Sequence, residues 1–584
     1  MIHLAKIRGY FAGNRFVVLA VVLFFIIFSE IFAQTNHTVC GKVWIYLDTD
    51  RISLDNFRPV DFCHKTKQRL GKKGAAYKRD DFSDYRPTEN FTRNLAPYVN
   101  KIISYSRVLK AYSAIVSPDQ IGKLERFPYV KAVLPVKTYR LSAMPESRKL
   151  LEKPTDTDFF YGNSYDQLQQ LNIPAVHDSG YTGKGVRICI IDTGFLKDHE
   201  IFSQIINDKR LIAEKDFIYN DDNVQDDRAG DTKFSRQPDH GTSVWSVIGG
   251  YKPGVLIGAA YGAEFLLAKT EEYSVESTLE EDRFIAAVEW ADEKGADIIS
   301  SSLAYRDFDD PSKDHSFEDL DGKTTNIAKS VNWAFERGIL PVICAGNENK
   351  NFDDGGLMTP SDAIGALTVG AVNGDKIIAG FSSHGPTADG RIKPDLCALG
   401  VNVLVAKYFS TDSYGYSSGA SFSTPLIAGS AALLMEKHPF YPPIKIVELL
   451  KSYANHSENP SDEYGWGIPD VRLSMFAADS TLFPDWEPTL NKIYAVPNPA
   501  NTDLTFRFRW TNILPSEKST SINVYNVLGE LVWSSEIRAE IAGTEEAVFW
   551  SLKNGDGKYV PTGVYLVTLK DGNTILRGKC LIIR

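Results

Sequence analysis

The sequence predicts an α/β protein built on a mostly parallel sheet with helices on both faces, preceded by a small α+β region and followed by a β-sandwich domain. Between residues 161 and 480, apolar strand-like runs alternate with helical ones, which is the pattern of a buried parallel sheet. Residues 109–136 read as a strand, a helix and a strand. Beyond residue 490 the sequence changes to strict alternation of apolar and polar side chains, which is typical of a sandwich.

The middle region contains six predicted strands and two clear helices. The strands are expected at Val186–Ile191, Glu264–Thr270, Ile298–Ser302, Leu340–Cys344, Ala366–Val372 and Val401–Ala406, and the helices at Leu279–Lys294 and Asn326–Arg337. Parallel strands end at a common edge of the sheet, where ligands and catalytic groups gather. We therefore look for functional side chains just after these strands.

The region before the sheet has its own folded pattern. Its predicted elements are the strand Leu109–Val116, the helix Pro118–Phe127 and the strand Val130–Val136, with Lys42–Asp48 as a further strand. Residues 142–158 are polar and contain prolines, so we interpret them as an exposed linker that is open to proteolysis.

The N-terminus has the order of a secretory signal. Three basic residues precede the apolar run Phe16–Phe28, and Ala33 supplies a small residue for cleavage, so residues 1–33 are interpreted as a signal peptide. An uncleaved membrane anchor is the alternative. It is less favoured because the run is shorter than the ~20 residues that span a bilayer and is followed by Glu30.

Charge and cysteine content narrow the classes of partner. A net charge of -10 gives no reason to expect nucleic acid among the partners. Cys189 and Cys344 lie in apolar strand-like runs and are expected to be buried thiols. Cys40 with Cys63 is the one plausible bridge, and no cysteine pair has the close spacing of a zinc site.

The stretch GASFSTPLIAG, residues 419–429, predicts the N-terminus of a buried helix. Small residues followed by Pro425 suit a first helical turn, where a missing N–H costs little. Negative charge is stabilised at such an end. A plain helix cap remains the alternative interpretation of Ser421 or Ser423.

Two other segments supply partners for Ser421. Asp192 ends a buried strand in ICIIDTGF, and His240 starts an apolar helix in DHGTSVWSVIGG. Each alone has an ordinary structural reading, but the chain order Asp, His, Ser matches a known catalytic triad. Imidazole can remove a serine proton near neutral pH, and a carboxylate on its other nitrogen fixes the tautomer. These roles fall to His240 and Asp192.

The blocks DTG, HGTSV and GASFSTP resemble the three catalytic blocks of the subtilisin-like serine proteases. PVICAGNE, residues 341–348, resembles the family's oxyanion block, and IISSSLA, residues 298–304, resembles the strand whose edge binds the peptide substrate. The resemblance implies a subtilisin-like fold and an acyl-enzyme mechanism. It implies Asp192, His240, Ser421 and Asn347 as catalytic residues, and Ser302, Leu303, Ala304 and Gly346 as substrate-binding residues.

The sequence departs from the usual blocks at several positions. Ala420, Ser423 and Leu426 replace threonine, alanine and histidine around the serine, and none of these is a group that the mechanism requires. Ser300 replaces an asparagine before the substrate-binding strand. Ala304 replaces a glycine and adds a methyl group where backbones come close, which leaves the substrate preference open.

Two further expectations concern the loops. A rough alignment brings Met358 near the floor of the pocket for the residue before the scissile bond, which suggests medium-sized apolar side chains. No cofactor is required for the chemistry. The acidic run Asn220–Asp231 could hold a structural calcium ion, as sites do in this family, but a solvated loop is the favoured alternative because the carboxylates have no regular spacing.

The flanking regions also resemble known modules. Residues 109–136 resemble the propeptide of many subtilisin-like proteases, so residues 34–153 are interpreted as propeptide and linker, and the mature enzyme is expected to start between Arg140 and Tyr161. An ordinary accessory domain is the alternative. A slowly folding parallel sheet would benefit from such a docked scaffold.

The last region, residues 491–584, is similar to the C-terminal sorting domains of the type IX secretion system of Bacteroidota. The PNP turn at residues 497–499, the strand that begins at Gly563 and the terminal KCLIIR carry the match. It implies passage across the outer membrane by a secretion machinery, with the product secreted or at the cell surface. An Ig-like binding module is the alternative.

We therefore predict a secreted serine endopeptidase, with a catalytic domain at residues 161–480, made as an auto-processed precursor and acting on proteins or peptides. The competing hypothesis is an inactive surface-binding protein on the same scaffold.

Overall fold

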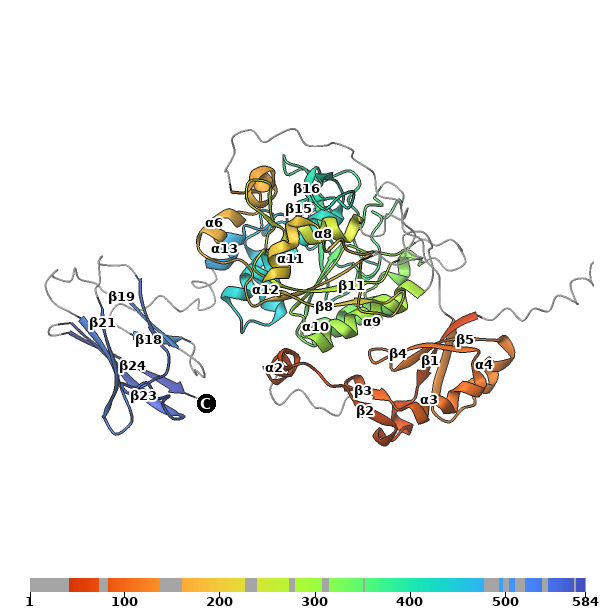
Figure 1. Ribbon diagram of the computed structural model, residues 1–584, viewed down its shortest axis with the longest axis horizontal. Coiled ribbons are helices and arrows are strands. Elements are labelled where there is room, and N and C mark those ends of the chain that lie inside the picture. The colour runs from red at the N-terminus through yellow and green to blue at the C-terminus, as the bar shows by residue number, and fades with distance from the viewer. Residues whose placement is uncertain are drawn as a thin grey trace, which may run out of the picture. The chain divides into compact units, whose positions relative to one another are not determined.

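The structure is a computed structural model that describes residues 41–72, 82–135, 160–225, 239–271, 279–306, 315–349, 352–476, 493–496, 504–509, 520–537, 545–571 and 574–582. The chain divides into two compact units, Met1–Met475 and Phe476–Arg584 (Figure 1). The predicted signal peptide and linker lie outside the described residues. Among the helices that are described, none is long and apolar enough to cross a membrane.

The N-terminal part of the first unit is a small antiparallel sheet with helices, in the order β4-β5-β1-β6. The predicted strand, helix and strand at residues 109–136 correspond to β5, α4 and β6. Its core contains Ile45, Tyr112 and Leu124, which are almost completely buried. The elements are β1 (Gly41–Leu47), β2 (Phe57–Pro59), α2 (His64–Lys72), β3 (Tyr85–Pro87), α3 (Glu89–Leu95), β4 (Lys101–Ser106), β5 (Ala111–Val116), α4 (Pro118–Leu124) and β6 (Val130–Pro135).

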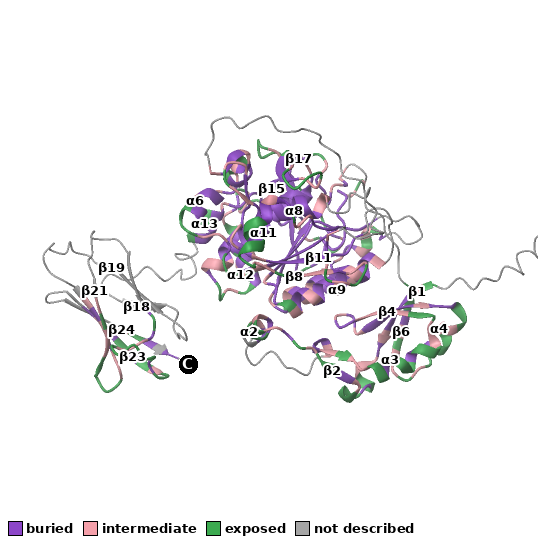
Figure 2. Ribbon diagram, viewed as in Figure 1, coloured by how far each residue is buried: buried purple, intermediate pink, exposed green. Residues whose placement is uncertain are grey.

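A seven-stranded parallel sheet forms the centre of the first unit, in the order β15-β14-β13-β12-β7-β11-β8. Its strands are β7 (Arg187–Asp192), β8 (Leu211–Asp216), β11 (Glu264–Lys269), β12 (Ile298–Ser301), β13 (Leu340–Cys344), β14 (Leu367–Val372) and β15 (Leu396–Leu399). Figure 2 shows these strands coloured mostly as buried, apart from the first residues of β7 and β11 and most of β8. The fold class predicted for this region is confirmed.

One predicted strand belongs to a different sheet, so its expected place was wrong. Val401–Ala406 corresponds to β16 (Val403–Ala406), which pairs in antiparallel fashion with β17 (Tyr414–Ser417) and is outside the parallel sheet. The two edge strands of the sheet, β8 and β15, were not predicted. β8 is only half buried, and its sequence LIAEKD has no continuous apolar run.

Helices cover both faces of the sheet. α9 (Leu279–Lys294) and α10 (Asn326–Glu336) lie side by side (Figure 1) and share a core cluster with the side chains of Cys189 and Ile191 on β7. Successive side chains of a strand point to opposite faces, so Ile188 and Ile190 face the other side. There α8 (Asp239–Gly249) and α11 (Ala420–Lys437) pack against each other. The first unit also contains β9 (Tyr251–Lys252), β10 (Leu256–Ile257), α5 (Tyr165–Gln169), α6 (Ile173–Asp178), α7 (Ser203–Asn207), α12 (Pro443–Ser452) and α13 (Val471–Phe476).

In the second unit, the described residues form two antiparallel sheets, β18-β19-β22 and β21-β20-β23-β24. Its buried core includes Ile522, Val524 and Trp550. The predicted alternation of Leu504, Phe506 and Phe508 falls in β19, whereas the PNP turn lies outside the described residues. The strands are β18 (Ile493–Val496), β19 (Leu504–Arg509), β20 (Thr520–Tyr525), β21 (Leu531–Ile537), β22 (Glu545–Trp550), β23 (Gly563–Asp571) and β24 (Thr574–Ile582).

The described cysteines are free thiols. Cys189, Cys344, Cys397 and Cys580 are buried, and burial raises the pKa of each of these thiols. Cys63 is half buried. Its predicted partner Cys40 lies outside the described residues.

Candidate active site

Asp192 is fixed at the carboxyl end of β7, in the middle of the parallel sheet. Its side chain is completely buried. The backbone N–H of Thr193 donates to its Oδ1 at 2.8 Å, and the Thr193 hydroxyl donates to the same oxygen at 3.2 Å. These bonds hold the carboxylate in one orientation, so its geometry is set before any substrate arrives.

His240 lies in the first turn of α8 and contacts this carboxylate directly. Its Nδ1 is 2.7 Å from Asp192 Oδ1. A carboxylate accepts hydrogen bonds, so Nδ1 carries the proton and the neutral ring has its lone pair on Nε2. Burial lowers the pKa of His240, but the charge of Asp192 and its hydrogen bond outweigh this effect, and the pKa is raised above its usual 6.5.

The approach of α8 to β7 depends on the glycine after His240. A Cβ added to Gly241 would lie 2.2 Å from the carbonyl oxygen of Gly194 and 3.2 Å from Cβ of Asp192. Any side chain at residue 241 would therefore push the start of α8 away from Asp192 and lengthen the bond between Asp192 and His240.

Ser421 is the second residue of α11 and is 1% exposed. The ring of the next residue, Phe422, lies 5.9 Å from the ring of His240, so the starts of α8 and α11 meet here. His240 Nε2 is buried and has no hydrogen-bond partner among the described residues, so the bond from the serine hydroxyl to Nε2 is not formed in this structure. In substrate-free sites, the hydrogen bonds used in catalysis are often long and shorten only in the substrate complex.

α11 begins earlier than the sequence suggests. We expected Pro425 in the first turn, but the helix starts at Ala420 and contains Pro425 in its second turn. The expected position was wrong because a donor just after β12 compensates for the missing N–H: the Ser302 hydroxyl donates to the carbonyl oxygen of Ser421 at 2.8 Å.

Asn347 lies beside the start of α11. The backbone N–H of Ala420 donates to Asn347 Oδ1 at 2.8 Å. Because an N–H can only donate, this bond identifies the oxygen and assigns the other side-chain atom, the Nδ2 donor. Nδ2 lies 3.5 Å from where a Cβ on Gly419 would be, and Gly419 has a φ of 152°, which side-chain-bearing residues rarely adopt. Asn347 thus presents a donor next to Ser421.

The residues predicted to bind substrate gather around this point. Ser302, Leu303 and Ala304 follow β12, and Gly346 follows β13, the neighbouring strand. Ala304 shares a buried cluster with Ala420 and Met358. The side-chain hydroxyl of Ser302 contacts Ser421.

Met358 lies behind Gly346. Its Sδ and Cγ are 3.1 and 3.3 Å from the position of a Cβ on Gly346, and the side chain is 6% exposed. Its thioether is therefore close to both the Gly346 and the Ala304 segments.

The loop that carries Met358 is held by Arg306, which sequence reasoning missed. The Arg306 Nη1 donates to Asp354 Oδ1 at 2.8 Å and to the carbonyl oxygen of Leu357 at 3.1 Å, and Nη2 also pairs with Asp354. The guanidinium lies 4.0 Å from the ring centroid of Phe352. The hydrogen bond from Arg306 lowers the pKa of Asp354.

No metal site is evident in the part of the chain that the structure describes. Groups of three or more His, Cys, Asp or Glu side chains that could hold a metal ion do not occur there. Residues 226–231 of the acidic run proposed for calcium lie outside that part. In the described portion of the run, Asp221 Oδ1 accepts a hydrogen bond from the backbone N–H of Asn223.

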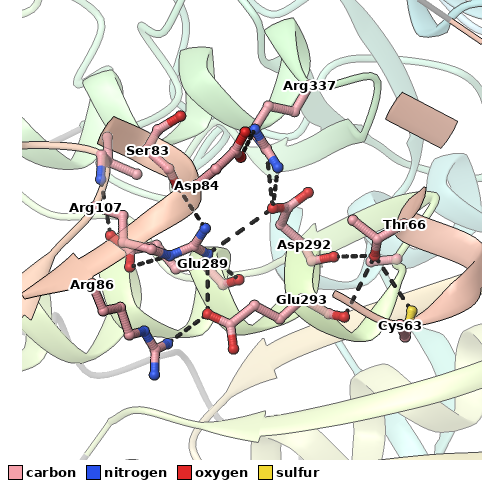
Figure 3. A network of polar contacts seen from close by, with 12 residues as sticks. Cys63, Thr66, Ser83, Asp84, Arg86, Arg107, Glu289, Asp292, Glu293 and Arg337 are labelled. Atoms are coloured by element: carbon pink, nitrogen blue, oxygen red, sulfur yellow. Dashed lines mark hydrogen bonds and ion pairs between the residues drawn. The ribbon is translucent and has the colours of Figure 1, made fainter. Parts of the chain in front are cut away.

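The N-terminal sheet contacts the catalytic region through a buried ionic network (Figure 3). Arg107 is completely buried, and its guanidinium lies 3.3 Å from Glu289 Oε2 and 3.1 Å from Glu293 Oε1, both on α9. The Ser106 hydroxyl and the backbone N–H of Val108 also donate to Glu289 Oε1, at 2.8 and 3.1 Å. Burial raises the pKa of Glu289, and Arg107 opposes that effect.

The network is reciprocal, because the catalytic region also supplies a cation. Arg337, at the end of α10, pairs with Asp84 of the N-terminal region at 3.1 Å and with Asp292 of α9 at 2.8 Å. A separate pair joins Lys42 to Asp282 at 2.7 Å. The N-terminal part is therefore matched in charge to α9 and α10. Sequence patterns carry no signal for these contacts, because the partners are far apart along the chain.

Comparisons with known proteins agree with this geometry. The family model described as the subtilase family matches residues 183–467, and the model described as a secretion system C-terminal sorting domain matches residues 492–584. Subtilisin E of Bacillus subtilis is 26% identical over 386 residues, which cover 64% of this chain and 89% of the relative. The serine protease AprX of Bacillus subtilis is 29% identical over 324 residues, which cover 50% of this chain and 67% of the relative. Subtilisin Savinase of Lederbergia lenta is 27% identical over 308 residues, which cover 53% of this chain and 97% of the relative.

Proposed function

We propose that the chain is a secreted serine endopeptidase with a subtilase domain at residues 183–467, in which Ser421, His240 and Asp192 form the catalytic triad. In this proposal, His240 Nε2 takes the Ser421 proton as the oxygen attacks the scissile carbonyl, and an acyl-enzyme forms. Asp192 holds the ring and stabilises its charged form. The single observation that carries the assignment is the 2.7 Å bond between His240 Nδ1 and Asp192 Oδ1. The His240 ring also lies near the start of α11, 5.9 Å from the ring of Phe422.

Negative charge on the tetrahedral intermediate needs donors at the same place. We assign Asn347 Nδ2 and the backbone N–H of Ser421 to this role. The bond from Ala420 to Asn347 Oδ1 supports the assignment because it fixes which side of the amide faces the site. The N-terminus of α11 adds favourable electrostatic potential for an anion.

Labelling with a fluorophosphonate tests the triad. The mature enzyme is expected to be labelled at Ser421, and Ser421→Ala and His240→Ala variants are expected to lose the label. Ser423→Ala is the matched control, because the Ser423 hydroxyl donates to the Ala398 carbonyl at 3.0 Å and is completely buried. Absence of labelling in the wild-type enzyme would favour the inactive binding protein instead.

We propose that residues 34–153 are a propeptide that covers the catalytic domain and assists its folding. The charge-matched contacts of Arg107 and Asp84 with α9 and α10 support a dedicated partner rather than an independent accessory domain. N-terminal sequencing of secreted enzyme is expected to find a start between Arg140 and Tyr161. A secreted enzyme that begins near Gln34 would contradict this role.

The C-terminal sorting domain directs the enzyme across the outer membrane. We propose that the secretion machinery recognises residues 491–584 and that the domain, folded as a β-sandwich, is removed at or after export. A chain that lacks these residues is expected to remain inside the cell envelope. Extracellular activity of the truncated chain at the wild-type level would reject the proposal.

We also propose that Met358 limits the pocket for the residue before the scissile bond. Its side chain packs against the Gly346 segment, which favours medium-sized apolar substrate side chains. A digest of a peptide library by the mature enzyme measures this preference directly, and strong preference for large aromatic residues would contradict it.

A further inference from the structure

Pro425 removes one hydrogen bond from the helix that carries Ser421. In an α-helix the N–H of residue i donates to the carbonyl of residue i−4, and proline has no N–H. Pro425 lies inside α11, so the carbonyl of Ser421 loses its regular partner. The proline ring also crowds that carbonyl and tilts it away from the helix axis.

The Ser302 hydroxyl occupies the place of the missing donor. Ser302 Oγ donates to the Ser421 carbonyl oxygen at 2.8 Å, across 119 residues of sequence. Both residues are buried, with exposures of 4% and 1%. In a buried setting, a carbonyl that lacks a donor is costly, so this bond has a strong influence on where the first turn of α11 lies.

The neighbouring carbonyl does not depend on another element in this way. The Ala420 carbonyl accepts a hydrogen bond from the Thr424 hydroxyl of its own helix at 2.9 Å. The bond from Ser302 is different, because it ties the first turn of α11 to the end of β12.

We propose that Ser302 is a positioning residue for Ser421: its hydroxyl replaces the N–H that Pro425 lacks and fixes the nucleophile relative to His240. The inference rests on the proposed function, in which Ser421 is the nucleophile. It gives the Ser302 side chain a role distinct from the substrate contact expected from the sequence, which its backbone can still make. Catalysis is sensitive to such placement, since a shift of about 1 Å can reduce the rate by about 10²-fold.

The test is a double-mutant cycle on the full chain with Ser302→Ala and Pro425→Ala. Ser302→Ala is expected to lower kcat by about 10- to 100-fold with KM within about twofold, because ground-state binding is unchanged. In the Pro425→Ala background, the new N–H of residue 425 can donate to the Ser421 carbonyl. The same Ser302→Ala change is then expected to alter kcat by no more than about twofold.

Two controls separate positioning from general damage. Ser302→Thr keeps the hydroxyl and is expected to retain kcat within about threefold. Ser301→Ala, at the last residue of β12, removes a hydroxyl that accepts from the Leu303 N–H at 3.3 Å, and its effect is expected to be the same in both backgrounds. If Ser302→Ala alone does not fold, recovery of folding in the Pro425→Ala background supports the inference, and failure to fold in both overturns it.

The outcomes distinguish this inference from the proposed function. Fluorophosphonate labelling of the wild-type enzyme establishes the nucleophile, and the labelling rate of Ser302→Ala is expected to fall by the same factor as kcat. An equal Ser302→Ala effect in both backgrounds, or a rise in KM with kcat unchanged, would overturn the positioning role while leaving Ser421 as the nucleophile. A wild-type enzyme that does not label at Ser421 would remove the proposed function itself.

Discussion

Replacement of Arg107 by alanine is expected to release the N-terminal region from the catalytic domain. Arg107 is completely buried and pairs with Glu289, whose side chain is 4% exposed, and with Glu293 (Figure 3). The alanine variant leaves the Glu289 carboxylate buried beside the interface without its guanidinium. The remaining donors, Ser106 and Val108, do not carry charge.

The magnitude follows from the burial of the pair. Removing one partner of a buried ion pair costs about 3–5 kcal/mol. At about 1.4 kcal/mol per factor of ten, the dissociation constant of the N-terminal region is expected to rise roughly 10²- to 10⁴-fold. Arg93→Ala is the matched control: Arg93 lies in the same region, but its side chain is 70% exposed and pairs with Glu89 of its own helix. Loss of this exposed ion pair is expected to cost about 1 kcal/mol of stability or less.

The assay uses the full chain on a Ser421→Ala background, so that the enzyme does not degrade its own N-terminal region. An added protease cuts the linker at residues 142–158, and the two pieces are followed by size-exclusion chromatography over a dilution series. The wild-type and Arg93→Ala pieces are expected to stay together at concentrations where the Arg107→Ala pieces separate. Equal dissociation constants for Arg107→Ala and Arg93→Ala would refute the reasoning.

Three further predictions concern the catalytic domain. Asn347→Ala is expected to lower kcat on a peptide substrate by about 10²–10³-fold, the range measured for loss of such a donor in subtilisin; a value within about twofold of wild type would contradict the assignment. Because Asp192 raises the pKa of His240 above its usual 6.5 and only the neutral ring accepts a proton, kcat/KM is expected to rise with pH through a value above 6.5; a profile already flat at pH 6 would contradict it. Arg306→Ala breaks the pair with Asp354 and is expected to change the ratio of kcat/KM between small and large apolar substrates by about tenfold, while the fluorophosphonate labelling rate stays within about threefold; an unchanged ratio would remove Arg306 from the control of specificity.

Most of the parallel sheet could be predicted because its inner strands are buried on both sides. Leu340–Cys344 was predicted with the observed bounds, since a short, continuous apolar run is typical of a strand covered on both faces. Edge strands do not meet that condition. β8 was not predicted because half-buried and polar residues interrupt its apolar run. β16 was placed in the wrong sheet because a short apolar run does not specify its partner.

The candidate site was predictable where chemistry restricts the residue type. Asp192 and His240 were assigned from their blocks, and the structure brings them within hydrogen-bonding distance. The support around them was not predictable: the bonds that Ser302 and Arg306 make depend on side-chain direction in three dimensions. The role of Pro425 was not predicted either, because we expected it in the first turn, where a missing N–H costs little; inside the helix it leaves the carbonyl four residues earlier without its helical donor.

The ionic network also determines the charge that the catalytic domain would expose without its N-terminal region. While the N-terminal region is bound, Lys42 and Arg107 neutralise Asp282, Glu289 and Glu293 along α9. If that region is removed, as we propose, these three carboxylates lose the cations that face them, and this flank of the catalytic domain gains net negative charge. The proposed removal of the N-terminal region would therefore change the surface electrostatics of the catalytic domain, and the new negative flank would repel acidic proteins while keeping the free enzyme dispersed in solution.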